Sequence, residues 1–230
     1  MHDGIREVNL MAVVTISREI YSEGSYIGEK VADGLGYHFV SKDGIEKIFL
    51  EYGLVEFGKV YESIEGFWTR FDDMRSTTIE FLKQVILALA NHGNVVIVGR
   101  GAFAVLGAFA DVLNVRVQAP LPFRVKRAME KEEITESHEA EVFLKKWDRE
   151  RDAFVESFYN IRWVDAAPKA FDMVINTGKV PPDMATAWVV EALRGLKKRK
   201  KDAELTTKTI KVDPELAGTV SEVLGCYDTH

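Results

Sequence analysis

Cysteine is nearly absent from this sequence: Cys226 is the only one, and there are just six prolines. A single cysteine excludes a disulfide within the chain and a zinc site built from several cysteines. Long hydrophobic runs are also missing, because charged and amide side chains interrupt even the most apolar stretch, residues 81–106. That stretch is therefore not a membrane span. Charged residues also break up the N-terminal segment, so no signal-peptide pattern is present. We expect a cytoplasmic protein with no membrane segment.

Positive charge is not in excess, since the formal net charge is −6. This balance gives no strong case for nucleic-acid binding. Hydrophobic residues make up 47% of the sequence, which excludes disorder throughout the chain. A length of 230 residues is enough for one α/β domain with a sizeable core.

The most informative stretch is residues 11–36. Residues 13–17 form a short apolar, β-branched run that is typical of a buried strand. A polar turn with Ser22 and Gly24 follows, and apolar residues then recur at helical spacing over 25–35. A strand, a small-residue turn and a helix are the layout of a phosphate-binding loop, in which backbone amides face an anion.

This loop departs from the full phosphate-loop motif, which requires Gly-Lys-Ser/Thr at its end. Gly24 is followed directly by Ser25, so the lysine is missing, and Glu23 adds a negative charge. Taken alone, the pattern leaves two interpretations open: an anion-binding loop, or an ordinary strand-to-helix turn.

Strand-like and helix-like segments alternate along most of the chain. Further strands are predicted at residues 37–40, 95–98, 112–119 and 171–177, and further helices at 44–52, 72–91, 120 onward, 137–159 and 182–196. Alternation of this kind predicts a mostly parallel sheet covered on both faces. Ligands bind beyond the C-terminal ends of such strands, which directs attention to residues 17–25, 99–101 and 176–178. We interpret residues 53–71 as a mobile or substrate-facing segment.

The basic run at residues 197–201 divides the chain. Five like charges favour a solvated linker, and the lack of interleaved aromatic residues argues against a nucleic-acid patch. We therefore divide the chain into a domain at 1–196, a basic linker at 197–204 and a small extension at 205–230. The extension is predicted to hold a strand at 206–212 and a helix at 214–224. It could dock on the domain, mediate assembly or be the remnant of a longer fusion.

Several motifs, in this order and spacing, together resemble the cytidylate-kinase-like family of P-loop nucleoside monophosphate kinases. They are Ile16-Ser17-Arg18-Glu19 with Gly24 and Ile27-Gly28, then Val96-Ile97-Val98-Gly99-Arg100-Gly101-Ala102, Ala119-Pro120-Leu121, Asp148 with Arg149 and Arg151, and Phe171-Asp172-Met173-Val174-Ile175-Asn176-Thr177. The resemblance implies an α/β protein: a three-layer α/β/α P-loop kinase fold with a mostly parallel central sheet. It also implies a monophosphate-binding region, a lid that bears arginines, and ATP and Mg²⁺ as cofactors.

In the loop, the resemblance implies that Ser22, Gly24 and Ser25 cradle nucleotide phosphates. Ser25 falls where a P-loop kinase has its magnesium-binding hydroxyl group. Since the loop lysine is missing, Arg18 is our candidate for supplying positive charge to the phosphates. Glu23 opposes it if its carboxylate points inward.

Outside the loop, the resemblance places Arg100 and Asp43 at the acceptor nucleotide. Arg124 and Arg127 correspond to phosphate contacts near the base of the lid. Arg149 and Arg151 correspond to lid arginines that neutralise the transferring phosphoryl group.

Two functions follow from the sequence. The first is a kinase that moves the ATP γ-phosphoryl group to CMP, dCMP or a related phosphorylated acceptor. The alternative is a catalytically weak or inactive module that senses a nucleotide or another phosphorylated ligand, or serves as a scaffold. A nucleotide substrate is the expected small-molecule partner, and residues 197–230 offer a surface for a homo-oligomer or another protein.

Overall fold

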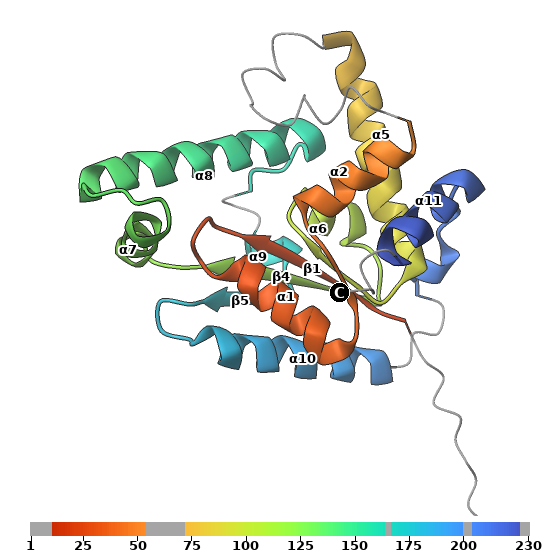
Figure 1. Ribbon diagram of the computed structural model, residues 1–230. Helices are drawn as coiled ribbons and strands as arrows, with labels where there is room; N and C mark the ends of the chain where they lie inside the picture. Colours follow the sequence, from red (N-terminus) through yellow and green to blue (C-terminus); the bar gives the residue numbers. More distant parts are fainter. Residues whose placement is uncertain (1–10, 54–71, 164–166, 200–203, 226–230) are drawn as a thin grey trace, which may run out of the picture.

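The computed structural model describes residues 11–53, 72–163, 167–199 and 204–225. Apart from Gly53, the segment predicted to be mobile or substrate-facing lies outside these residues. One five-stranded sheet organises the described chain, with strand order β2-β3-β1-β4-β5 (Figure 1). Its strands are β1 (Val13–Arg18), β2 (His38–Val40), β3 (Val95–Val98), β4 (Val112–Gln118) and β5 (Met173–Asn176).

Every neighbouring pair of strands is parallel. The central strand, β1, pairs Ile16 with Val98 of β3, and Arg18 with Val117 of β4. The segments that follow these three strands therefore emerge side by side at one edge of the sheet. Ligands bind at this edge in open α/β sheets.

Helices α1 (Gly24–Leu35) and α10 (Pro182–Lys198) cover one face of the sheet. In α1, Ile27 and Val31 are buried at helical spacing, and Gly36 ends the helix in a left-handed conformation with φ of 64°. Ile27 and Val31 pack on alternate residues of β1, Val14 and Ile16. Because side chains alternate between the two faces of a strand, the intervening residues point to the opposite layer.

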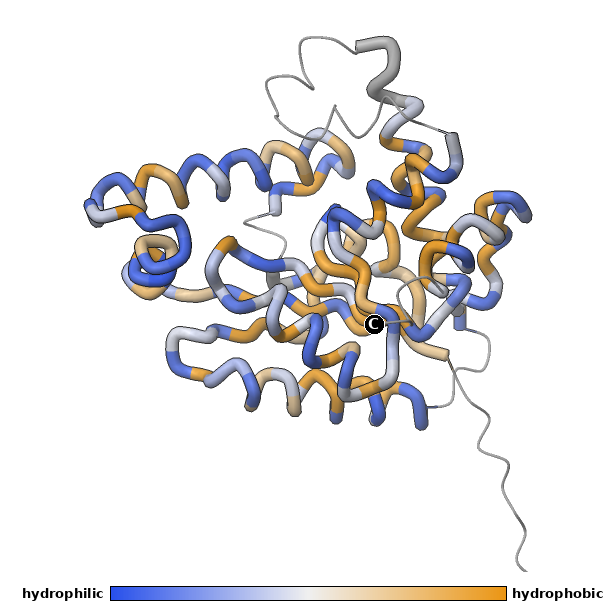
Figure 2. The backbone as a smooth tube through the Cα atoms, in the orientation of Figure 1, coloured by the Kyte–Doolittle hydropathy of each residue, from blue (hydrophilic) through white to orange (hydrophobic). Residues whose placement is uncertain are grey.

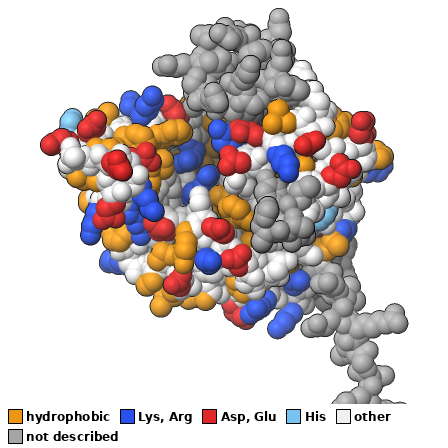
Figure 3. Space-filling view, viewed as in Figure 1, with side chains coloured by type: hydrophobic (Ala, Val, Ile, Leu, Met, Phe, Trp, Pro, Cys, Tyr) orange, Lys and Arg blue, Asp and Glu red, His pale blue; other side chains and the backbone are white. Residues whose placement is uncertain are grey.

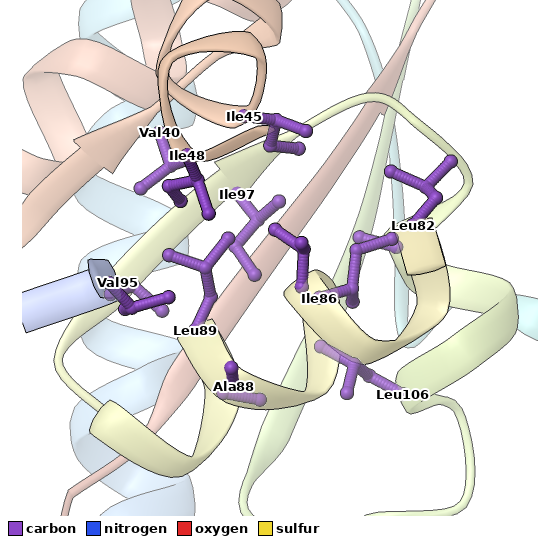
Figure 4. Packing of buried hydrophobic residues seen from close by; sticks show 14 of the residues in the cluster. Val40, Ile45, Ile48, Leu82, Ile86, Ala88, Leu89, Val95, Ile97 and Leu106 are labelled. Atoms are coloured by element: carbon purple, nitrogen blue, oxygen red, sulfur yellow. The ribbon is translucent and has the colours of Figure 1, made fainter. Parts of the chain in front are cut away.

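The opposite face is covered by α2 (Lys42–Glu51), α5 (Asp72–His92), α6 (Ala102–Leu106) and α11 (Pro214–Gly225). Ile97 of β3 meets Ile45 and Ile48 of α2 and Leu89 of α5 in this layer (Figure 4). Figure 2 shows hydrophobic residues gathered on the strands and on the helix sides that face them. The two helical layers confirm the predicted α/β/α fold.

Helices α7 (Leu121–Lys131) and α8 (Ser137–Tyr159) pack against each other beside the loop between β1 and α1 (Figure 1). Their contact is apolar and centres on Val125, Ala128, Ala140 and Leu144. The short α9 (Ala167–Ala170) precedes β5. Helices α7 and α8 extend past the sheet at the edge where ligands are expected.

The C-terminal extension packs on the core. Leu216, Val220, Val223 and Leu224 of α11 are buried in the cluster that also contains α2 and α5. The predicted strand at 206–212 is wrong: a short 3₁₀ helix, η1 (Thr207–Thr209), lies there. The amide and hydroxyl of Thr207 donate hydrogen bonds to the Asp111 carboxylate, so this amide is not available to pair with a strand. The predicted helix at 214–224 is confirmed.

No helix within the described ranges is both long and apolar enough to span a membrane.

Candidate functional site

The loop between β1 and α1 turns through two positive φ angles, 58° at Tyr21 and 65° at Glu23. These values are costly for residues with a Cβ atom, so surrounding contacts must hold the loop. Buried Ser22 lies between them, with its hydroxyl 2.8 Å from the Glu19 carbonyl oxygen and 3.1 Å from that of Val117. The Ser22 side chain therefore fastens the loop to β4, and its contribution to an anion site is through the backbone.

Helix α7 and Glu132, the residue that follows it, hold the two strained residues. The Glu23 carboxylate forms an ion pair with Arg127, with 3.1 Å between Oε1 and Nε. Nη1 of Arg127 donates a 3.0 Å hydrogen bond to the Tyr21 carbonyl oxygen, and the Tyr21 hydroxyl donates to Glu132. The negative charge in the loop is thus compensated by Arg127.

Arg18 runs across the loop from the end of β1. Its Nε donates a 3.4 Å hydrogen bond to the Ser25 hydroxyl oxygen. A Cβ atom at Gly24 would lie 2.4 Å from Cβ of Arg18, and one at Gly99 would lie 2.2 Å from its Nη1. Two glycines of the predicted motifs therefore make room for Arg18: Gly24 for the start of its side chain and Gly99 for its guanidinium group.

Arg100 and Arg151 join Arg18 in an arginine cluster. Burial, followed by repulsion from Arg151 and Arg100, lowers the pKa of Arg18 to about 9. Burial also lowers the pKa of Arg151, and Arg100 and Arg124 contribute to this effect. Nη1 of Arg151 is buried and has no hydrogen-bond partner among the described residues. An anion would relieve both the repulsion and the missing hydrogen bond.

Acidic side chains position several of these cations. Glu46 of α2 lies 3.7 Å from Nη2 of Arg100. Arg124 is buried between two carboxylates, with 2.8 Å from Nη1 to Asp148 and 3.4 Å from Nε to Glu19. Arg124 thus ties α7 to α8 and to the end of β1, whereas Arg18 and Arg151 carry charge that is less fully paired.

Arg116 is a buried cation that the sequence interpretation missed. It lies on β4 opposite Ser17 of β1, with its guanidinium carbon 4.2 Å from the centre of the Trp163 ring. Nη1 donates a 2.6 Å hydrogen bond to the Trp163 carbonyl oxygen, and the indole nitrogen donates to the Ser17 hydroxyl. A charged residue inside the apolar run at 112–119 was the signal that could have identified it.

Arg149 and Asp43 lie apart from the cluster, whereas Ser25 contacts it through Arg18. Arg149 is exposed on α8, where its Nε donates to the Lys145 carbonyl oxygen. Asp43 is exposed in the first turn of α2, one helical turn before Glu46. Ser25, the candidate magnesium ligand, is exposed at the start of α1. Groups of three or more His, Cys, Asp or Glu side chains able to hold a metal are not found in the described part of the chain.

The geometry suits a polyanion with several phosphate oxygens. Backbone amides at the start of α1, the Ser25 hydroxyl and the guanidinium groups of Arg18, Arg100 and Arg151 converge from β1, β3 and α8. This convergence, more than any one motif, marks the site.

This chain is similar in sequence and structure to several known proteins. The sequence model described as the cytidylate kinase-like family matches residues 13–179. The cytidylate kinase of Ignicoccus hospitalis is 30% identical over 188 residues, which cover 80% of this chain and 98% of that enzyme. An uncharacterised protein from Eubacterium ventriosum has a similar structure, with a TM-score of 0.59, 22% identity, and coverage of 80% of this chain and 98% of its own. The shikimate kinase of Acinetobacter baumannii matches at 13% identity and a TM-score of 0.46, over 82% of this chain and 96% of its own.

Proposed function

We propose that this chain, which belongs to the cytidylate kinase-like family, moves the γ-phosphoryl group of ATP to CMP, dCMP or a related phosphorylated acceptor. The observation that carries this proposal is the arginine cluster beside the β1–α1 loop. Phosphoryl transfer needs alignment and positive charge over the equatorial oxygens of the phosphoryl group. Arg18, Arg100 and Arg151 offer that charge in a partly desolvated setting.

Each part of the site has a role in this proposal. The loop amides and Arg18, in place of the missing lysine, would hold the phosphates of the donor. Arg100, which Glu46 of α2 positions, would face the acceptor. Asp43, also on α2, would face the acceptor as well. Arg151 would neutralise charge on the transferring group, and Arg149 would join it from α8.

The residues present also fit magnesium. P-loop kinases bind this ion through one hydroxyl group, substrate phosphates and water, so they need no all-protein cage. Ser25 supplies an exposed hydroxyl beside Arg18, in agreement with that chemistry. Bound with ATP, magnesium would supply positive charge that offsets the negative charge of the phosphates. A cytoplasmic location is part of the same proposal and rests on the single cysteine.

The direct test is ADP release with ATP, magnesium and a panel of nucleoside monophosphates. We expect turnover that depends on the acceptor, with CMP or dCMP among the best. Arg151→Gln should lower kcat/KM by about a hundredfold or more, as for removal of a charge that stabilises the transition state. Arg149→Gln is the matched variant on the same helix, and we expect a smaller loss because its side chain is exposed. A wild-type rate no higher than that of Gly24→Pro would contradict the proposal.

A second candidate function is a nucleotide-sensing module without turnover. The supporting observation is that the Ser22 hydroxyl donates to backbone carbonyl oxygens, while Tyr21 and Glu23 occupy left-handed backbone positions that favour glycine. This alternative predicts that ATP raises the melting temperature without being consumed. Acceptor-dependent conversion of ATP to ADP would exclude it.

A further inference from the structure

Trp147 exposes a large aromatic surface next to the candidate site. It is 42% exposed on α8, although a buried position is usual for so large an apolar ring. Its ring packs edge-on against Phe143, with 6.2 Å between centroids, and Phe143 in turn lies 6.5 Å from Tyr21. We call these three residues the aromatic row.

The aromatic row runs from the β1–α1 loop toward the arginine cluster. Tyr21 is part of the β1–α1 loop, where Arg127 holds its backbone. Phe143, Trp147 and Arg151 follow one another at intervals of four residues, so they share one side of α8. Trp147 is thus one helical turn from Arg151, whose Nη1 is buried without a hydrogen-bond partner among the described residues.

The surface combines the two chemical features that a nucleotide presents. Figure 3 shows hydrophobic side chains along α8 next to Lys or Arg side chains set back in the surface. A nucleotide has an anionic phosphate chain at one end and a flat aromatic base at the other. Stacking on an exposed indole suits any base, because every base has a π-face.

We propose that the nucleobase of the phosphate donor stacks on Trp147 while its phosphates occupy the loop and the arginine cluster. This inference rests on the proposed function, in which ATP is the donor, and adds the residue that binds the base of that donor. The donor is the better match than the acceptor because Tyr21, at the start of the aromatic row, belongs to the loop that would hold the donor phosphates. Trp147 would then set affinity for the base, and Arg151 would bind the phosphates.

Binding of ATP and of inorganic tripolyphosphate separates the two contributions. Isothermal titration of the full chain with magnesium should show that Trp147→Ala weakens ATP binding about tenfold. Tripolyphosphate has no base, so its affinity should stay within about twofold of wild type. Trp147→Phe should restore most of the ATP affinity. Trp188→Ala is the matched control, since Trp188 is 46% exposed but lies on α10, and we expect it to leave both affinities unchanged.

The outcomes are distinct. Equal weakening of ATP and tripolyphosphate in Trp147→Ala would show that Trp147 only supports the fold of α8, and would overturn the inference. Unchanged ATP affinity in that variant would also overturn it, while leaving the arginine cluster and the proposed function intact. A loss confined to CMP binding would overturn the assignment to the donor. Failure of both ATP and tripolyphosphate to bind the wild-type chain would contradict the proposed function itself, and the stacking role with it.

Discussion

Glu23 and Arg127 form an ion pair that connects the phosphate loop to α7, with 3.1 Å between Oε1 and Nε. The sequence alone left open whether the Glu23 carboxylate would repel a bound phosphate. Its pairing with Arg127 neutralises much of that charge, and the same arginine also binds the Tyr21 carbonyl oxygen. An acidic residue in this loop is therefore compatible with the proposed anion site.

Breaking this ion pair should weaken anion binding more than it weakens the fold. We expect Arg127→Met to reduce tripolyphosphate affinity about tenfold. The Glu23 carboxylate is then unpaired and repels the phosphates, although solvent partly screens this repulsion. The free energy of unfolding should fall by no more than about 1 kcal/mol, as for a partly exposed ion pair. Calorimetric titration and urea denaturation measure the two effects.

The double variant Glu23→Gln/Arg127→Met serves as the control for that experiment. It removes both charges, so affinity should return to within about twofold or threefold of wild type. If the double variant stays as weak as Arg127→Met, Arg127 itself contacts the phosphates, which is the role that the family resemblance implies for it.

The lowered pKa of Arg18 should make anion binding sensitive to high pH. Only the protonated guanidinium attracts an anion, so affinity for sulfate should fall as pH rises through about 9. Sulfate keeps the same charge over this range, so the change reports on the protein. In the anion-free protein, the stability of the fold changes in the opposite direction. Burial of the charged guanidinium destabilises the fold fully below about pH 9, and this cost is relieved as pH rises above that value.

Thermal stabilisation by sulfate, measured from about pH 7.5 to about pH 10, checks this prediction. Arg18→Gln should show weaker stabilisation by sulfate and a smaller decline with pH. A wild-type response that stays flat across the whole range would contradict a role for Arg18 in binding the anion.

Gly99 should be needed for the position of Arg18 as well as for its backbone angle. Gly99 has φ of 85°, and an added Cβ would lie 2.2 Å from Nη1 of Arg18. Gly53 has φ of 90° with no atom within 4 Å of an added Cβ, so Gly53→Ala is a matched control for backbone strain. Both alanine variants should lose about 1–2 kcal/mol of stability. Only Gly99→Ala should also weaken tripolyphosphate binding, and wild-type affinity in that variant would refute this account.

Thr207 should anchor the C-terminal extension. Its amide and hydroxyl both donate to the buried Asp111 carboxylate, and the hydroxyl bond is 2.7 Å long. Thr207→Val removes the hydroxyl bond to a charged acceptor, so urea denaturation should show a loss of about 2–3 kcal/mol. Thr209→Val is the comparison, because exposed Thr209 bonds only the Thr206 carbonyl oxygen in its own turn, and about 0.5 kcal/mol is expected. Equal losses in the two variants would contradict the anchoring role.

Assembly through the extension stays a prediction, and the buried residues of α11 affect how it should be tested. Deleting 197–230 would strip Leu216 and Val220 from the core, so a loss of assembly in that deletion would not identify an interface. Substitutions of exposed residues on α11, such as Glu215 and Glu222, are the better probe. Light scattering of those variants measures the oligomeric state.

The fold could be predicted from the sequence because strands and helices alternate with clear apolar periodicity. Val13–Arg18 is a buried β-branched run, and Ile27 and Val31 mark the buried side of the next helix. The run at 206–212 was misread as a strand because β-branched Thr, Ile and Val predominate there. The hydrogen bonds of Thr207 to Asp111, nearly a hundred residues earlier, decide its structure, and the local sequence cannot predict so distant a contact.

The candidate site was predictable in its place but only partly in its members. Parallel strands bring the segments after β1 and β3 together, so the sequence located the edge where Arg18 and Arg100 meet. It did not separate Arg151, which joins the cluster, from exposed Arg149, because both occur on one charged helix. Arg116 was missed since its role depends on Trp163, a partner that only the folded chain brings near.

The buried position of α11 has a consequence for biosynthesis. Its apolar side completes a core to which α2 and α5 contribute much earlier in translation. A nascent chain that has reached only the end of α10 must therefore leave that apolar surface open to water and to chaperones. Emergence of α11 from the ribosome, rather than completion of the sheet, is therefore the step at which this core can first close.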